Sequence, residues 1–373
     1  MIIFHEYMPP TGRRLLFFFD GTSERAAGPV DVTLTNAFRL NQEITFGFNG
    51  TPQIAFYFAG VGTRGDGIAA ATGRGFDQIV IESFINLSSN YMEGDHIYLF
   101  GFSRGAAAAR ALSSLLSVVG LLNADNLAFF PEVWEYFVDD KLRPTEKAKL
   151  RKKFQPSLVA PAPRVEFLGC FDTVAGSGWD RINLFTHVRL HNARLEPSVR
   201  HAVQILSIDD DRNPSFSPSL WAGKSTEDQT LEQVWMPGVH ADIGGCSDAI
   251  LIGNIALLTM IERVKQYCPE VEWDQEGDPW RVVEAIRQAD RVEITYERPK
   301  LGRKLLAKAA RKIGGYSQFI HPIFEVINGK TFSVKGSRKI YVPLNYDTNG
   351  LPEFCTKHKQ FFEAECRRAL ALS

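Results

Sequence analysis

Three polar residues in this chain could form a nucleophilic catalytic set, because a hydroxyl, a carboxylate and an imidazole follow one another along the sequence. They are Ser103, Asp172 and His240. A serine hydroxyl becomes a nucleophile when an imidazole takes its proton, and a carboxylate that orients the imidazole completes the arrangement. The set predicts acyl transfer through a covalent acyl-enzyme, a reaction for which we expect neither a metal ion nor an organic cofactor.

The segment around Ser103 has the sequence of a sharp turn between a strand and a helix. The apolar run 97–100 predicts a buried strand, and the alanine-rich segment after the turn predicts a helix. Ser103 lies between Gly101 and Gly105, in a G-x-S-x-G pattern that keeps strand and helix from clashing. We predict Ser103 as the nucleophile and the Arg104 N–H as an oxyanion donor, since the start of a helix favours negative charge. The simpler alternative is that Ser103 only caps an ordinary helix.

A second oxyanion donor is predicted in the loop that follows the apolar run 15–19. This run predicts a strand, and it is followed by Asp20, Gly21 and Thr22. Polar turns at the carboxyl ends of parallel strands are where α/β proteins place their sites. The N–H of Gly21 or Thr22 is therefore the candidate donor, with Asp20 orienting the loop. In the alternative interpretation, Asp20 or Ser23 only caps the next helix.

The candidate acid and base also follow predicted strands. Asp172 comes directly after the strand predicted at 165–171, and His240 lies in a glycine-containing loop after the strand predicted at 233–236. Asp242 competes for the role of acid, but residues two positions apart rarely present their side chains to each other. We therefore predict Asp172 as the acid and expect Asp242 to hold the histidine loop by accepting hydrogen bonds from backbone N–H groups. The alternatives are a capping aspartate and an ordinary loop histidine.

The composition excludes several other classes of protein. The net charge is −1 over 373 residues, which disfavours nucleic acid as a partner. Five scattered cysteines without C-x-x-C spacing argue against a disulfide framework or a structural zinc site. The first residues do not resemble a signal peptide, and no apolar run is long enough to span a membrane. We expect synthesis in the cytoplasm, in a reducing compartment.

Strands and helices alternate through the first two thirds of the chain, which predicts a single α/β domain over 1–373. The expected fold class is a mostly parallel sheet covered by helices on both faces. The aromatic and basic segment 121–160 is predicted as a helical insertion that serves either as a cap or as a solvated surface. The segment 197–206 is predicted as a short helix. The acidic triplet 209–211 is predicted as a solvated turn rather than a cation site, because the spacing of a calcium loop is absent.

Alternation is weaker in the C-terminal extension, residues 268–373. The segment 298–313 is basic and amphipathic, with Arg311 among its cations. Such a helix either lies on an anionic lipid surface or exposes a solvated basic face. The extension is thus predicted to be a cap or a membrane-facing element.

Six blocks of sequence, in order, resemble the α/β-hydrolase catalytic domain of type VI secretion phospholipase effectors. The blocks are FFFDGT (17–22), YFAGVGT (57–63), GDHIYLFGFSRGAAAAR (94–110), FLGCFDTV (167–174), VRHAVQILSIDDDR (199–212) and VWMPGVHADIGG (234–245). The resemblance runs from about residue 13 to 262 and implies an α/β-hydrolase fold. By position it implies Ser103 as nucleophile, Asp172 as acid and His240 as base. Two departures concern the loops: Ser23–Glu24 replace an aromatic-asparagine pair, and Cys246 replaces a third glycine.

The resemblance also implies a substrate and partners. It implies a phospholipase A-type esterase that acts on the acyl chains of glycerophospholipids at a membrane surface. A secretion apparatus and an immunity protein are the implied partners, with export by type VI secretion. Two alternatives stay open: a carboxylesterase that acts on small or non-lipid esters, and a non-catalytic interaction protein that keeps the hydrolase fold.

Overall fold

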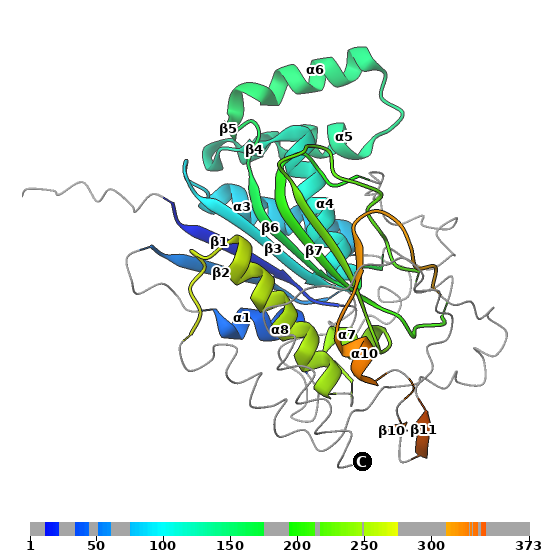
Figure 1. Cartoon of the computed structure of the whole chain (residues 1–373). Coiled ribbons are helices and arrows are strands. Elements are labelled where there is room, and N and C mark those ends of the chain that lie inside the picture. Colours follow the sequence, from blue (N-terminus) through cyan, green and yellow to red (C-terminus); the bar gives the residue numbers. More distant parts are fainter. Residues whose placement is uncertain are drawn as a thin grey trace, which may run out of the picture.

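A parallel sheet forms the centre of the protein in the computed structural model (Figure 1). The structure describes residues 12–21, 34–44, 51–60, 75–174, 194–212, 217–247, 250–274, 311–327, 329, 331–334 and 337–340. Within these ranges the sheet has seven strands in the order β2-β1-β3-β6-β7-β8-β9, and every neighbouring pair is parallel. The strands are β1 (Arg14–Phe19), β2 (Gln53–Phe58), β3 (His96–Phe102), β6 (Val165–Phe171), β7 (Val199–Ser207), β8 (Thr230–Met236) and β9 (Gln318–Ile320).

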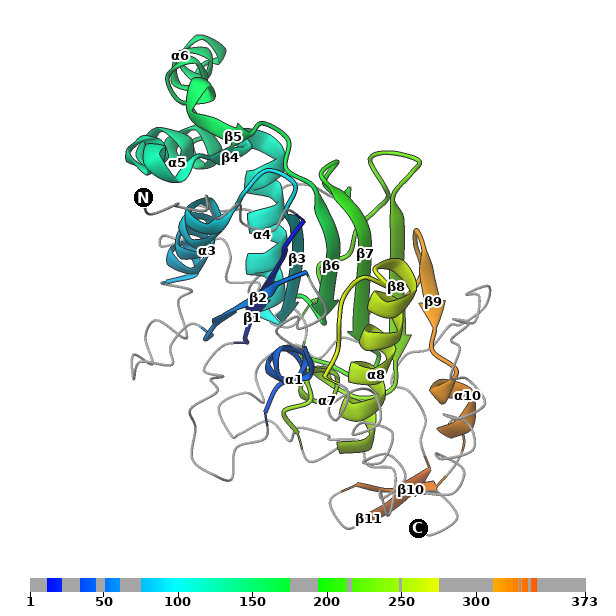
Figure 2. The ribbon, with the colours of Figure 1, turned by 90° about the vertical axis from the view of Figure 1, so that its left-hand side faces the viewer.

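Helices cover both faces of this sheet, as Figure 2 shows. On one face lie α3 (Phe76–Asn90) and α4 (Arg104–Val119), and on the other lie α1 (Asn36–Glu43), α7 (His240–Gly244), α8 (Ile250–Tyr267) and α10 (Ile323–Ile327). Successive side chains of a strand point to opposite faces, so each strand serves both cores. In β1, Leu15 and Phe17 join the core under α4, whereas Leu16 and Phe18 join the core under α8. A parallel sheet with a hydrophobic core and helices on each of its two faces confirms the predicted α/β class.

The segment predicted as a short helix at 197–206 is a strand instead. It forms β7, which pairs with β6 on one side and β8 on the other. The apolar side chains of Val203 and Ile205 are fully buried. β-branched residues fit a strand that is covered on both faces, and this tertiary packing decides the structure of the segment.

The predicted insertion at 121–160 does form helices, but they lie far from Ser103. The segment contains η1 (Ala124–Phe129), α5 (Phe130–Val138), α6 (Pro144–Phe154) and η2 (Gln155–Ser157), with a small sheet of β4 (Leu121–Leu122) and β5 (Leu158–Ala160). Arg151 of α6 donates to the carbonyls of Val118 and Val119, at the last turn of α4. Since Ser103 precedes the first turn of α4, the length of that helix separates it from the insertion, at the upper end of Figure 1. Of the two alternatives for this segment, a cap and a solvated surface, this position favours the solvated surface.

The C-terminal extension contributes an edge strand to the sheet. β9 pairs in parallel with β8, and a separate hairpin forms from β10 (Thr331–Val334) and β11 (Ser337–Ile340). Most of the predicted basic helix at 298–313 lies outside the described residues, and its last three residues are not helical. Among the described helices, none is both long enough and apolar enough to cross a membrane.

Candidate active site

Ser103 lies at the tip of the turn between β3 and α4, in a backbone conformation that few side chains adopt. Its φ is 57° and its ψ is −122°. Such a conformation costs on the order of 1–3 kcal/mol and persists only where the surroundings impose it. Here the Ser103 N–H donates to the carbonyl of Phe171 at 3.0 Å, and its own carbonyl accepts from Ala107 N–H at 3.2 Å. The turn is thus held by the neighbouring strand on one side and by the helix on the other.

Two glycines give this turn the space that it needs. A Cβ atom at Gly101 would lie 2.6 Å from the backbone nitrogen of Ala106, and one at Gly105 would lie 2.5 Å from the carbonyl oxygen of Asp20. Both distances are shorter than real Cβ contacts, so any larger residue would push α4 away from the sheet. The G-x-S-x-G pattern is therefore required sterically at both glycines.

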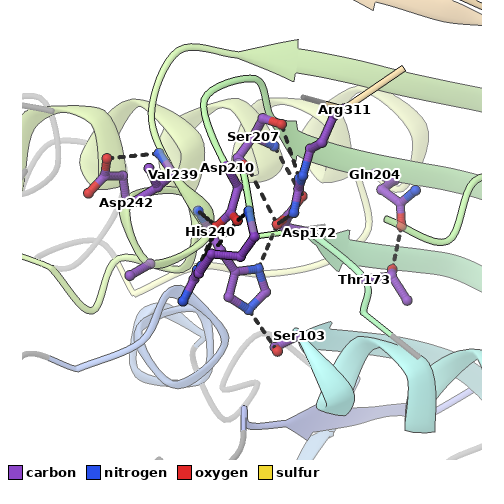
Figure 3. A network of polar contacts seen from close by, with 12 residues as sticks. Ser103, Asp172, Thr173, Gln204, Ser207, Asp210, Val239, His240, Asp242 and Arg311 are labelled. Carbon is purple, nitrogen blue, oxygen red and sulfur yellow. Dashed lines mark hydrogen bonds and ion pairs between the residues drawn. The ribbon is translucent and has the colours of Figure 1, made fainter. Parts of the chain in front are cut away.

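The imidazole of His240 joins Ser103 to Asp172 (Figure 3). His240 is the first residue of α7, and its Nε2 lies 2.8 Å from Ser103 Oγ. Its Nδ1 lies 2.5 Å from Asp172 Oδ2. An ionised carboxylate only accepts hydrogen bonds, so this contact assigns the proton to Nδ1 and leaves Nε2 to accept from the serine hydroxyl. The phenyl ring of Phe102 packs against the imidazole, with 4.8 Å between ring centroids.

Asp172 follows β6 and is completely buried. Oδ1 accepts from the Ser207 N–H at 3.1 Å and from Arg311 Nη1 at 2.5 Å, while Oδ2 accepts from Arg311 Nη2 at 2.9 Å as well as from His240. Burial alone would raise the pKa of this carboxyl, but the Arg311 guanidinium and the His240 hydrogen bond outweigh burial and hold the pKa well below its usual range. The carboxylate is therefore ionised and surrounded by donors.

Asp242 contacts the backbone of the histidine loop. Its Oδ2 accepts from the Val239 N–H at 2.9 Å, and its Oδ1 accepts from Ser247 Oγ at 2.6 Å. The carboxylate beside the imidazole is that of Asp172. The two aspartates thus occupy different places around His240, one at its ring and one at its loop.

A sequence model described as "T6SS, Phospholipase effector Tle1-like, catalytic domain" matches residues 13–263, which is more than half of the chain. The chain belongs to this family. The β-strands that carry Ser103, Asp172 and His240 all lie within the matched region.

Individual proteins resemble this Tle1-like domain over parts of their length. The uncharacterized protein YEL023C of Saccharomyces cerevisiae is 27% identical over 229 residues, which cover 55% of this chain and 32% of that protein. The chain thus spans about a third of the length of this curated relative. Among solved structures, an uncharacterized protein from Pseudomonas aeruginosa has a TM-score of 0.41 at 19% identity, covering 68% of this chain and 45% of its own. The Tle1 effector bound to the VgrG spike of the type 6 secretion system has a TM-score of 0.37 at 21% identity. The match covers 64% of this chain and 52% of that chain.

Two aspartates of the Tle1-like domain that were predicted in a solvated turn are instead buried beside His240. Asp209 and Asp210 are 1% and 2% exposed. Asp209 Oδ2 accepts from the Gly238 N–H at 2.7 Å, and Asp210 Oδ2 accepts from the His240 N–H at 3.2 Å. Burial opposes ionisation of Asp210, yet its hydrogen bonds with Arg212 lower its pKa. The prediction was wrong because the triplet follows β7, whose end lies beside the histidine loop.

Asn36 is a site residue that the sequence analysis did not single out. It is buried in α1, and its Nδ2 donates to the carbonyls of Ile243 at 3.0 Å and Gly253 at 2.9 Å. The asparagine thereby fixes α7, which begins with His240, to α8. Nothing in the sequence distinguishes it from an ordinary polar residue of a short helix.

The loop after β1 is organised by Asp20. Its Oδ1 accepts from Thr35 Oγ1 at 2.6 Å and from the Gly21 N–H at 3.0 Å, and its Oδ2 accepts from the Tyr57 hydroxyl at 2.6 Å. Burial raises the pKa of Asp20, against the effect of the Thr35 and Tyr57 hydrogen bonds. Thr22 lies outside the described residues. The Gly21 N–H, a candidate oxyanion donor, is thus engaged with Asp20 in this structure.

Arg311 lies in the site rather than on a basic surface. It was predicted among the cations of a lipid-facing or solvated helix face, but it is 3% exposed and pairs with Asp172. The prediction was wrong because this arginine pairs with a distant buried carboxylate, whereas Lys312 beside it is exposed. A buried guanidinium requires a buried anion, and the sequence does not show which anion that is.

Proposed function

We propose that this chain is a serine hydrolase that cleaves the carboxylic esters of glycerophospholipids, with Ser103 as nucleophile, His240 as base and Asp172 as acid. The observation that carries the proposal is the continuous chain of contacts from Ser103 Oγ through His240 to Asp172, at 2.8 Å and 2.5 Å. Membership of the Tle1-like phospholipase effector family supports the choice of a lipid ester as substrate.

The first chemical step follows from these contacts. His240 Nε2 takes the proton of Ser103 as Oγ attacks the ester carbonyl, and the ionised Asp172 stabilises the imidazolium that forms. The protonated His240 then returns its proton to the leaving alcohol, which is the lysophospholipid. This leaves the fatty acyl group bonded to Ser103 Oγ. A water molecule, deprotonated by the same imidazole, releases the fatty acid and restores the hydroxyl.

The negative charge on the carbonyl oxygen requires N–H donors. We propose the Arg104 N–H as the first, because Arg104 directly follows the nucleophile and begins α4, where the helix dipole favours negative charge. The second donor is Gly21 or Thr22. Since the Gly21 N–H already donates to Asp20 Oδ1, Thr22 is the better proposal.

Products released from a mixture of phospholipids test this function. Wild-type protein should release free fatty acid and lysophospholipid, detected by mass spectrometry, and Ser103→Ala should reduce the release by several orders of magnitude. A fluorophosphonate probe should label the wild type but not Ser103→Ala. Hydrolysis of short-chain nitrophenyl esters without any release from lipids would favour a carboxylesterase on small esters. No labelling of folded wild-type protein would favour a non-catalytic interaction protein.

The route of export and the partners rest on the family resemblance. We propose a phospholipase A-type effector that a type VI secretion apparatus carries and an immunity protein inhibits. The VgrG spike is the partner of the Tle1 effector in the similar solved structure. Co-purification of this chain with a secretion spike protein from its own cell tests the first of these partners.

A further inference from the structure

Arg311 reaches the acid of the proposed catalytic set from beyond the family match, which ends at residue 263. Its two terminal nitrogens each bind a different oxygen of Asp172, Nη1 to Oδ1 at 2.5 Å and Nη2 to Oδ2 at 2.9 Å. A planar guanidinium that binds both oxygens fixes the plane of the carboxylate as well as its charge. The oxygen that receives Nη2 is the same one that faces His240 Nδ1.

The guanidinium is itself held in place. Nη1 also donates to the carbonyl of Ser207 at 3.0 Å, and the N–H of Ser207 donates back to Asp172 Oδ1 at 3.1 Å. The arginine, the end of β7 and the carboxylate therefore close a ring of hydrogen bonds, which Figure 3 shows beside the imidazole. Rotation of the Asp172 side chain would break contacts on both of its oxygens.

The backbone that carries Arg311 is fixed by the edge of the sheet. Gln318 in β9 accepts from the Gly314 N–H at 3.0 Å and from Trp235 Nε1 of β8 at 2.7 Å. The pairing of β9 with β8 continues this attachment. The segment that begins at Arg311 thus reaches the site as part of the sheet.

The charged groups around the Asp172–Arg311 pair come from three parts of the chain. His240 contributes from α7 and Arg311 from the segment before β9, while Asp210, which follows β7 and pairs with Arg212, acts on His240 and Arg311. Burial disfavours the charged form of Asp172, and the guanidinium is the strongest influence that opposes burial and lowers its pKa. Without Arg311, the partners of the buried carboxylate among the described residues would be the imidazole and the donors of Ser207.

We propose that Arg311 is a positioning residue of this hydrolase, which keeps Asp172 ionised and aimed at His240 Nδ1. The C-terminal segment then completes a site whose other members come from the matched domain. The inference rests on the proposed function, since positioning the acid matters only if Asp172, His240 and Ser103 react as a set.

Three variants of the full-length protein test this role: Arg311→Met, Arg311→Lys and, as a matched control, Lys312→Met. Lys312 is the adjacent cation and is exposed. Ester hydrolysis is measured as kcat/KM over a series of pH values, with circular dichroism to verify folding. Arg311→Met should lower kcat/KM at neutral pH by about 100-fold, the scale of a misplaced catalytic group. In the pH profile of kcat/KM for Arg311→Met, the fall in activity on the acid side, the acid limb, should occur at higher pH than in the wild type. The reason is that the guanidinium no longer opposes proton uptake by the Asp172–His240 pair. Lys312→Met should match the wild type.

Arg311→Lys separates charge from geometry and also serves if Arg311→Met does not fold. An ammonium keeps the positive charge but binds the two oxygens less well, so we expect about a tenfold loss with the acid limb near its wild-type position. Wild-type kcat/KM in Arg311→Lys, or an unmoved acid limb in folded Arg311→Met, would overturn the inference. A wild-type protein that neither hydrolyses esters nor reacts with a fluorophosphonate would instead refute the proposed function.

Discussion

Replacing Asp172 with asparagine tests the proposed catalytic set at its carboxylate, which accepts hydrogen bonds from several donors at once. The two oxygens accept from Ser207 N–H, from both terminal nitrogens of Arg311 and from His240 Nδ1. All of these partners are donors, so an amide NH₂ group in either orientation faces a donor. If the amide nitrogen faces the imidazole, Nδ1 must become an acceptor and the proton moves to Nε2. Ser103 then has no base.

The size of the effect follows from that wrong tautomer. In a serine-histidine-aspartate set, the change of aspartate to asparagine lowers kcat by about 10⁴-fold. At about 1.36 kcal/mol per factor of ten, this corresponds to about 5.4 kcal/mol in the activation free energy. Because Arg311 would lose its buried counter-charge, the free energy of unfolding should also fall by about 3–5 kcal/mol.

Asp242→Asn is the matched control, because it makes the same chemical change at a second buried aspartate, in the loop that carries His240. Its amide oxygen can still accept one of the two hydrogen bonds, from Val239 N–H or from Ser247 Oγ. We expect less than a tenfold loss of kcat and about 1–3 kcal/mol of destabilisation. Steady-state hydrolysis of a nitrophenyl ester, together with urea unfolding, measures both quantities. A larger loss of kcat in Asp242→Asn than in Asp172→Asn would refute the assignment of the acid.

Three further predictions concern the surroundings of the site. Gly105→Ala should abolish detectable hydrolysis and lower the urea midpoint, because its Cβ would lie 2.5 Å from the Asp20 carbonyl oxygen; wild-type activity would contradict the close approach of α4 to β1. Asn36→Ala should lower the free energy of unfolding by about 1–3 kcal/mol and reduce kcat, since two buried carbonyls lose their donor; an unchanged urea midpoint would count against this. The pKa of Asp172 is lower in the folded state than in the unfolded state, where it is about 4. The ionised Asp172 therefore raises the free energy of unfolding at pH values above about 4, and this contribution is lost as the pH falls below about 4. The free energy of unfolding should therefore vary less with pH in Asp172→Asn than in the wild type, by up to about 1.4 kcal/mol per pH unit below pH 4, and identical slopes would disprove it.

The strands of the sheet were predictable where a local pattern and the tertiary environment agree. The runs at 15–19, 97–100 and 165–171 are mainly apolar and short, and each lies in a strand of the sheet. The turn at Ser103 was predictable for a steric reason, because a turn this sharp leaves no room for a Cβ atom at Gly101 or Gly105. The position of each candidate after its strand followed in turn, since parallel strands end at one edge of a sheet.

The features that the sequence did not reveal depend on contacts between distant segments. β7 has the polar residues of an amphipathic helix, and only its position between two other strands makes it extended. Asp209 and Asp210 look like a solvated acidic turn until the loop of His240 is folded against them. Arg311 belongs to a run of cations, and no local property separates the one that is buried from those around it.

The pairing of β9 with β8 has a consequence for the order in which the chain is made. A ribosome releases the amino-terminal part first, so the segments that bear the hydroxyl, the imidazole and the carboxylate emerge well before Arg311. Until β9 joins the edge of the sheet, the growing polypeptide holds the carboxylate of Asp172 without its arginine partner. If Arg311 has the proposed positioning role, activity begins only after this last segment has been made, and a product that stops short of residue 311 would be a poor hydrolase.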